Sequence, residues 1–147
     1  MNKIMIIAIV GIILLVVGVS GCTDSSETIN PEELKSNSTA VTAKQLYSSS
    51  ISNGSYVKMT GYVLDIQDGT MRIAQTKNYG YGVSGLDYDN DIMVTGDFGS
   101  DFYENEEVNI WGVYQGSTSY DTAMGGKRTI PYLSSAIVEK TGNRYQS

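Results

Sequence analysis

Three aspartates at alternate positions form a group of potential metal ligands in the sequence. They are Asp87, Asp89 and Asp91. Hard cations such as calcium bind several oxygen ligands, so this spacing suits a calcium site. An EF-hand loop would also need a glycine and an acidic residue at the positions that Ile92 and Phe98 occupy, so that motif is absent. Two interpretations remain, namely a calcium site that stabilises a surface adhesion protein and a solvated acidic loop.

The sequence does not contain the groups from which a hydrolytic site is usually built. It has no histidine, which is the commonest general base, and no G-x-S-x-G motif that would mark a nucleophilic serine. None of its 16 acidic residues is singled out as half of a catalytic carboxylate pair. We therefore expect a protein that is not an enzyme and that uses no cofactor.

Aromatic and basic side chains offer another kind of chemistry, which is the stacking and hydrogen bonding of a ligand. Residues 77–88 are rich in glycine and tyrosine, and exposed tyrosines can stack on sugars or bases. Each candidate also has a structural interpretation, in which the tyrosines of a flexible loop cover the fold and Trp111 packs in the core beside the aromatic residues of segment 98–103. The candidate ligand-binding residues are Arg72, Lys77, Tyr79, Tyr81, Tyr88 and Trp111.

The charge balance of the chain bears on its partners. It has 16 acidic and 10 basic residues, a net charge of −6. An acidic protein is repelled by phosphate backbones, so nucleic acid is an unfavoured partner. The densest basic spot is Gly125-Gly126-Lys127-Arg128, which fits either a contact to a phosphate or lipid headgroup or a β-turn before the last strand.

The N-terminus has the pattern of an export signal. Lys3 precedes an apolar stretch over residues 4–19, which is short for a helix that crosses a bilayer. The following Val19-Ser20-Gly21-Cys22 resembles the lipobox of prokaryotic lipoprotein precursors. That resemblance implies that a lipid is attached to Cys22 and that the chain is cut before it. The alternative is an uncleaved anchor helix, and both place the rest of the chain at the outer face of the cell membrane.

These observations predict three segments. They are a signal peptide over residues 1–21, a lipid-anchored flexible tether over residues 22–40 and a folded domain over residues 41–147. The tether is polar and poor in aromatic residues, so it cannot bury enough apolar surface to order itself. Cys22 is the sole cysteine, which excludes a disulfide within the chain. Glycosylation sequons begin at Asn37 and Asn53, and nothing in the sequence shows that either is used.

The domain has the alternating pattern of β-strands. Thr42 is a suitable N-cap for a short helix over residues 42–50. Strand 55–67 changes phase at Gly61, which indicates a β-bulge and a bend, and Asp68-Gly69 is a hairpin turn. The remaining strands are expected over residues 70–74, 91–95, 107–114 and 132–138. Five strands, one of them long and bent at a glycine, predict a small closed barrel with one or two short helices.

Three strand motifs carry a resemblance to a known fold family. Residues 56–63 resemble the V-x-V-x-G-x-V opening strand of OB-fold domains, residues 106–116 their fourth strand, and residues 130–138 their closing strand. The chain resembles the lipoprotein branch of the tRNA_anti-like OB-fold families over about residues 41–140. The resemblance implies an all-β, five-stranded OB-fold-like barrel, with a short helix at residues 98–103 closing it. OB-folds often bind oligonucleotides or oligosaccharides on one face, and this implication rests on fold alone.

Two functions from different classes are compatible with these features. The first is a membrane-anchored binding module that holds an envelope protein, a peptide or a glycan. The second is an oligonucleotide-binding protein, which would need Lys and Arg among aromatic residues, whereas only Arg72 and Lys77 lie near the second strand.

Overall fold

The computed structural model describes residues 28–146 with the exception of residue 49. The expected signal peptide and the expected lipidation site at Cys22 lie outside the described residues. Among the residues that are described, none belongs to a helix both long and apolar enough to cross a membrane.

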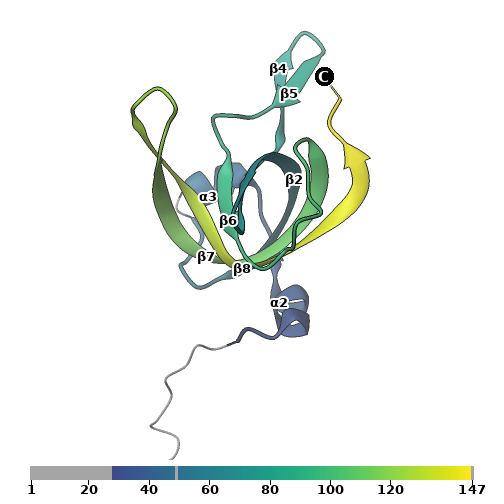
Figure 1. The fold of residues 1–147 in the computed structure, drawn as a ribbon, viewed down its shortest axis with the longest axis vertical. Coiled ribbons are helices and arrows are strands. Elements are labelled where there is room, and N and C mark those ends of the chain that lie inside the picture. Colours follow the sequence, from purple (N-terminus) through teal and green to yellow (C-terminus); the bar gives the residue numbers. More distant parts are fainter. Residues whose placement is uncertain (1–27, 49, 147) are drawn as a thin grey trace, which may run out of the picture.

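Five strands close into a ring (Figure 1). In order around the ring they are β2 (Tyr56–Gln67), β3 (Thr70–Ala74), β6 (Ile92–Thr95), β8 (Lys127–Arg144) and β7 (Glu106–Asp121). Antiparallel pairing of β2 with β7 completes the ring. The contact between β6 and β8 is parallel, and the other contacts in the ring are antiparallel. The expected fold class, an all-β protein built on a five-stranded barrel with short helices, is confirmed.

The remaining elements lie outside the ring. Helix α2 (Pro31–Asn37) and the short strand β1 (Thr39–Ala40) precede it, and β1 pairs in parallel with β2. Helix α3 (Ala43–Tyr47) follows, and β4 (Thr76–Gly80) pairs with β5 (Val83–Leu86) in a separate hairpin. Figure 1 shows this hairpin at one end of the molecule and α2 at the other.

Apolar side chains from all five strands of the ring fill its interior. Alternation along each strand turns every second side chain inward. Side chains with no exposed surface come from β2, β3, β6, β7 and β8, and include Val63, Met71, Ile73, Ile92, Val94, Val108, Ile110 and Leu133. The barrel is therefore a packed core, and a ligand has to bind on its outer surface or at its loops.

The bend in β2 differs in position from the prediction. Val57, Met59, Gly61 and Val63 are all buried, so the inward phase continues through the glycine. The bulge comes later, where the pairing with β3 shifts between Val63 and Asp65. Gly61 has another role, because a Cβ atom there would lie 2.5 Å from Ile73 Cγ2. The glycine permits close approach of β2 to β3, so the expected phase change at Gly61 is wrong.

The expected short helix at residues 98–103 is also absent from the structure, where this segment is irregular. Gly99 has a φ of +70°, a left-handed conformation that an α-helix cannot contain. Phe98 and Phe102 nevertheless pack against the core and meet edge to face, with ring centroids 6.3 Å apart. The barrel is closed here by two aromatic side chains on an irregular loop.

The segment expected to be a flexible tether is ordered over its second half. Asn30 caps α2 by accepting a hydrogen bond from the Glu32 N–H, and Pro31 occupies the first turn. Leu34 is buried, and Lys35 forms an ion pair with Glu139 of β8. A capped helix with one buried leucine and an ion pair to β8 thus orders this polar segment against the barrel.

Three elements have the predicted type but different lengths. Helix α3 is shorter than predicted, and Thr42 is its N-cap as expected, in a capping box with Gln45. Strands β7 and β8 extend well beyond the expected ranges 107–114 and 132–138. They continue as a long hairpin whose turn is closed by a 2.7 Å hydrogen bond from the Thr122 N–H to the Gly126 carbonyl.

Candidate functional site

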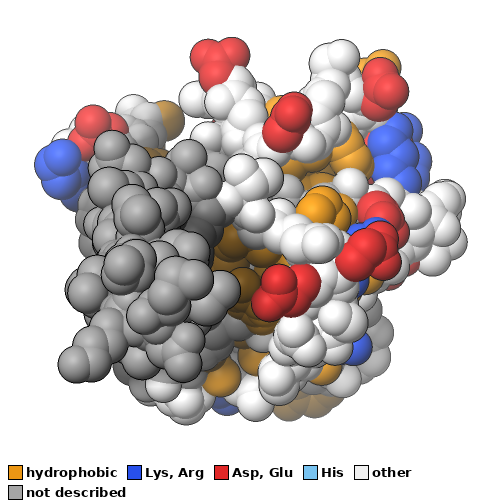
Figure 2. All heavy atoms as spheres, turned by 90° about the horizontal axis from the view of Figure 1, so that it is seen from below, with side chains coloured by type: hydrophobic (Ala, Val, Ile, Leu, Met, Phe, Trp, Pro, Cys, Tyr) orange, Lys and Arg blue, Asp and Glu red, His pale blue; other side chains and the backbone are white. Residues whose placement is uncertain are grey.

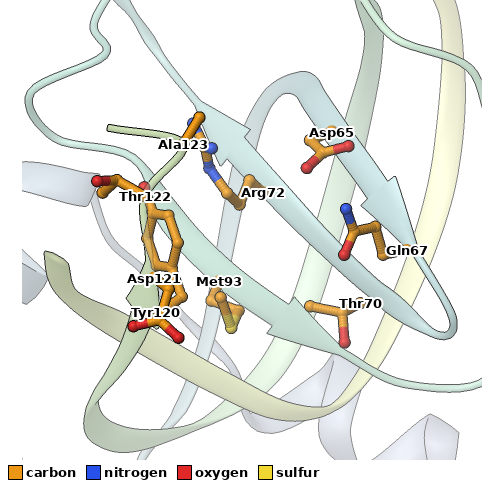
Figure 3. A pocket seen from close by; sticks show the side chains of 9 residues that line it. All are labelled: Asp65, Gln67, Thr70, Arg72, Met93, Tyr120, Asp121, Thr122 and Ala123. Atoms are coloured by element: carbon orange, nitrogen blue, oxygen red, sulfur yellow. The ribbon is translucent and has the colours of Figure 1, made fainter. Parts of the chain in front are cut away.

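A groove of about 530 Å³ opens on the outer surface of the barrel (Figure 3). Strands β3 and β6 form its floor, the end of β2 forms one side, and the tip of the β7–β8 hairpin forms the other. The extension of β7 and β8 beyond the barrel creates the second wall. The lining residues are Asp65, Gln67, Thr70, Arg72, Met93, Tyr120, Asp121, Thr122 and Ala123.

Arg72 is the basic residue of this groove, and its position is fixed from two sides. Its Nε donates a 3.0 Å hydrogen bond to Asp91 Oδ2. Its guanidinium carbon lies 5.2 Å from the centre of the Tyr120 ring, which is within the range of a cation–π contact. The terminal amino groups of a guanidinium held through Nε remain available as a planar pair of donors.

The partner of Arg72 is a buried carboxylate that also serves a second arginine. Asp91 has no exposed surface, and its Oδ1 lies 2.6 Å from Arg128 Nη2. That contact is an ion pair without an aligned hydrogen bond. Arg128 also donates a 2.6 Å hydrogen bond to the Tyr88 carbonyl. A buried carboxylate needs such compensation, because desolvation alone strongly disfavours its charge.

Helix α3 is connected to the same cluster. The Tyr47 hydroxyl donates a 2.8 Å hydrogen bond to the backbone carbonyl of Asp91. Burial of the phenol, and then the nearby Asp91 carboxylate, raise the pKa of Tyr47 above its ordinary value. Burial opposes the charge of Arg128, but Asp91 and Tyr47 outweigh it, so the pKa of Arg128 is raised. The cluster is therefore an arginine–carboxylate–arginine triad with a net charge of +1 at neutral pH.

The six expected ligand-binding residues do not lie together. Only Arg72 lines the groove. Lys77, Tyr79 and Tyr81 lie on the β4–β5 hairpin, where the Tyr79 hydroxyl donates to the Leu86 carbonyl at 2.9 Å. The Tyr88 side chain is exposed on the loop that follows.

Trp111 is in a different part of the fold. It is half-buried on β7, and Lys35 of α2 lies over its ring at 4.8 Å from the centroid. Its structural surroundings are those of a helix-docking site, and it has no contact with the groove.

The three aspartates proposed as calcium ligands point to different partners. Asp87 accepts hydrogen bonds from the Asp89 N–H and the Asn90 side chain, and so closes its own turn. Asp89 lies 4.0 Å from Lys77 and is mostly exposed, whereas Asp91 is enclosed by two arginines. Within the described residues, no three metal-binding side chains form a group that could hold an ion. The structure does not bring the expected metal ligands together.

The basic segment at residues 125–128 is divided between a turn and a strand. Gly125 and Gly126 belong to the hairpin turn, while Lys127 and Arg128 begin β8. Lys127 pairs with Asp121 at 3.3 Å, and Arg128 pairs with Asp91. The β-turn interpretation agrees with the glycines, and both cations already have carboxylate partners.

Most of the groove was not foreseen from the sequence. Tyr120, Asp121, Thr122 and Ala123 lie beyond the predicted end of the fourth strand. Residues 117–120 alternate between exposed and half-buried positions in the structure. Their sequence, Ser-Thr-Ser-Tyr, shows no matching alternation of polar and apolar residues. The available signal was the pair of glycines at 125 and 126, which can mark a hairpin tip with strands extending on both sides.

Figure 2, which views the molecule from below relative to Figure 1, shows acidic side chains spread over the described part of that face, with apolar side chains visible between them. In comparison with known proteins, no protein-family model and no curated protein matches the chain.

Proposed function

We propose that this protein is a lipid-anchored, extracytoplasmic, non-enzymatic binding module that holds a glycan in the groove beside the β7–β8 hairpin. The observation that carries the proposal is the Arg72 guanidinium, which is fixed by Asp91 and faces the Tyr120 ring within a groove of polar side chains.

The lining suits the chemistry of a sugar. A sugar ring presents hydroxyl groups at its edge and C–H groups on its faces. Asp65 and Gln67 offer acceptor oxygens, Arg72 and Gln67 offer donors, and the Tyr120 ring offers a flat surface for stacking. OB-folds, which this barrel resembles, often bind oligosaccharides or oligonucleotides. That analogy adds to the proposal and does not carry it.

A protein or peptide ligand is the less favoured alternative for this groove. Binding hot spots in protein interfaces are usually large apolar or aromatic side chains that enter a desolvated pocket. Here the apolar contribution comes mainly from Met93 and Tyr120, among acidic, amide and hydroxyl side chains. If an apolar side chain of a protein ligand entered this groove, many polar groups of the lining would be left without hydrogen-bond partners, which costs free energy.

An oligonucleotide is disfavoured by charge. Binding of a single strand needs several cations along the path of the phosphates, among aromatic side chains. In the groove, Arg72 is paired with Asp91, and the lining includes the carboxylates Asp65 and Asp121.

The proposed lipid anchor and the fold together suggest how the folded domain is oriented relative to the membrane. If Cys22 carries the lipid, the eight peptide units from Cys22 to Asn30 span at most about 28 Å when fully extended. The end of the molecule that carries α2 would then face the membrane, and the β4–β5 hairpin would point away from it. Replacing Cys22 with alanine should abolish incorporation of labelled palmitate. Failure of the wild type to incorporate the label would support the uncleaved anchor helix.

Binding itself is tested with the full-length protein in detergent against a panel of uncharged and acidic oligosaccharides, by titration calorimetry. Substituting Arg72 by glutamine or Tyr120 by alanine should weaken the binding of the best ligand at least about tenfold, or ~1.4 kcal/mol. Lys77→Gln and Tyr79→Ala are the matched controls on the β4–β5 hairpin and should change it little. A ligand unaffected by both groove variants, or no saccharide binding at millimolar concentration, would refute the proposal.

A further inference from the structure

Three basic side chains lie in the groove or at the hairpin beside it, and a fourth, Lys77, lies on the β4–β5 hairpin; each is paired with a carboxylate. Asp91 pairs with Arg72 at 3.0 Å and with Arg128 at 2.6 Å. Lys127 pairs with Asp121 at 3.3 Å, and Lys77 lies 4.0 Å from Asp89. Arg128 stands directly opposite Tyr120 in the β7–β8 pairing, so their side chains share one face of the hairpin.

The pairs differ in how firmly the carboxylate is held. The side chains of Asp121 and Asp89 are 81% and 85% exposed. Exposed ion pairs are weak and screened by salt, so an arriving anion can replace either carboxylate at little cost. The Asp91 side chain is 0% exposed, and the Tyr47 hydroxyl holds its backbone carbonyl. Asp91 cannot leave its two arginines without local unfolding.

We infer that Asp91 is a specificity-determining residue, whose buried carboxylate keeps polyanions out of the groove by permanently cancelling one of the two arginine charges. Without it, Arg72 and Arg128 would form an unneutralised basic pair beside the Tyr120 ring. Cations among aromatic rings are the arrangement that binds single-stranded nucleic acid. The inference deepens the proposed function of the groove, and its test does not require the proposed glycan.

The test compares full-length wild type with Asp91→Asn for binding of fluorescein-labelled oligothymidylate, measured by fluorescence polarisation over a range of salt concentrations. Asp91→Asn should bind at least about tenfold more tightly at low salt. The slope of log K against log salt should steepen by about 0.7 for each phosphate gained. Asp121→Asn removes the same charge from an exposed position and is the matched control, for which a smaller gain is expected. No gain in a folded Asp91→Asn protein, or an equal gain in both variants, would overturn the inference.

A second comparison covers the case in which Asp91→Asn does not fold. The double variant Asp91→Asn/Arg128→Gln leaves one arginine beside a neutral side chain, which is a milder change than two uncompensated arginines. Against Arg128→Gln alone it differs only in the Asp91 charge. Tighter oligothymidylate binding by the double variant would support the inference, and equal binding would overturn it.

The two proposals can fail separately. Failure of the wild type to bind any oligosaccharide would count against the glycan proposal and leave the oligothymidylate comparison intact. Saccharide binding by the wild type without a gain of polyanion binding in the Asp91 variants would retain the glycan proposal and remove the role of Asp91.

Discussion

The Tyr47 hydroxyl and the Asp91 backbone carbonyl are joined by a 2.8 Å hydrogen bond that ties helix α3 to the start of β6. The two residues are 44 positions apart in the sequence. The bond fixes the backbone of the residue whose side chain holds both Arg72 and Arg128. Helix α3 is thus part of the support of the groove, although it does not line it.

Replacing Tyr47 with phenylalanine should lower the free energy of unfolding at pH 7 by about 1 kcal/mol, because the partly buried carbonyl loses its donor. The wild type should also lose stability above pH 10, the ordinary pKa of tyrosine. There the unfolded chain releases a proton that the folded protein retains, since the pKa of Tyr47 is raised in the fold. Urea unfolding as a function of pH measures both effects.

The alkaline loss should be smaller in Tyr47→Phe than in the wild type. Tyr81→Phe, at a fully exposed position on the β4–β5 hairpin, is the control and should behave as the wild type. If Tyr47→Phe and the wild type lost the same amount of stability above pH 10, this phenol would not contribute to the pH dependence.

Gly61 is expected to tolerate no side chain. A Cβ there would lie 2.5 Å from the buried Ile73 Cγ2 and 3.0 Å from the Ala74 carbonyl oxygen. Gly61→Ala should therefore destabilise the barrel by roughly 1–3 kcal/mol, the usual cost of overpacking. Gly126→Ala is the matched control, because its nearest contact would be an ordinary 3.5 Å to Thr122 Oγ1. Equal denaturant midpoints for the two variants would argue against close packing of β2 on β3.

Local patterns were sufficient to predict the barrel. Alternation along strand 55–67, the Asp68-Gly69 turn and the Thr42 cap each depend on residues that are close in sequence, and the structure contains all three. The bulge was misplaced because a glycine in a strand has two explanations, a bulge or a close approach. Only the distance between Gly61 and Ile73 distinguishes them.

The candidate site depends on contacts between residues that are distant in sequence, and these were not predictable. Asp91 was assigned to a metal site because Asp87 and Asp89 are its nearest acidic neighbours in the sequence. Its actual partners, Arg72 and Arg128, approach it through the pairing of β6 with β3 and β8. The groove wall at Tyr120 was missed because its strand is polar on both faces, so hydrophobic alternation gave no signal there.

Glu107 should contribute to acid stability. Its carboxylate accepts hydrogen bonds from Thr141 at 2.6 Å, Asn143 at 2.8 Å and Tyr62 at 3.1 Å, and those from Thr141 and Asn143 are the main causes that lower its pKa. The associated stability is present above the ordinary pKa of 4.5 and is lost as the pH falls through the lowered pKa. Glu107→Gln should therefore be less stable at pH 7, by about 1 kcal/mol or less.

The difference between Glu107→Gln and the wild type should shrink as the pH falls from 4.5 through the lowered pKa of Glu107, because the wild-type carboxyl then becomes neutral like the amide. Thermal melts across the acid range measure it. Glu104→Gln, an exposed change on the preceding loop, is the control, and its melting temperature should depend on pH in the acid range as that of the wild type does. A stability difference that does not depend on pH would mean that the charge of Glu107 is unimportant.

The docking of helix α2 can be followed with one intrinsic probe, because Trp111 is the only tryptophan in the chain. Lys35 of α2 lies over its ring, and Leu34 is the buried residue of the helix. A seven-residue helix is unstable on its own in water, so α2 depends on this packing. Leu34→Ala should therefore release α2 and shift the Trp111 emission to longer wavelength, while the β-sheet circular dichroism stays unchanged. Lys44→Ala, on the exposed face of α3, should leave the emission as it is. An unshifted emission in Leu34→Ala would show that the helix is held by contacts other than its single buried leucine.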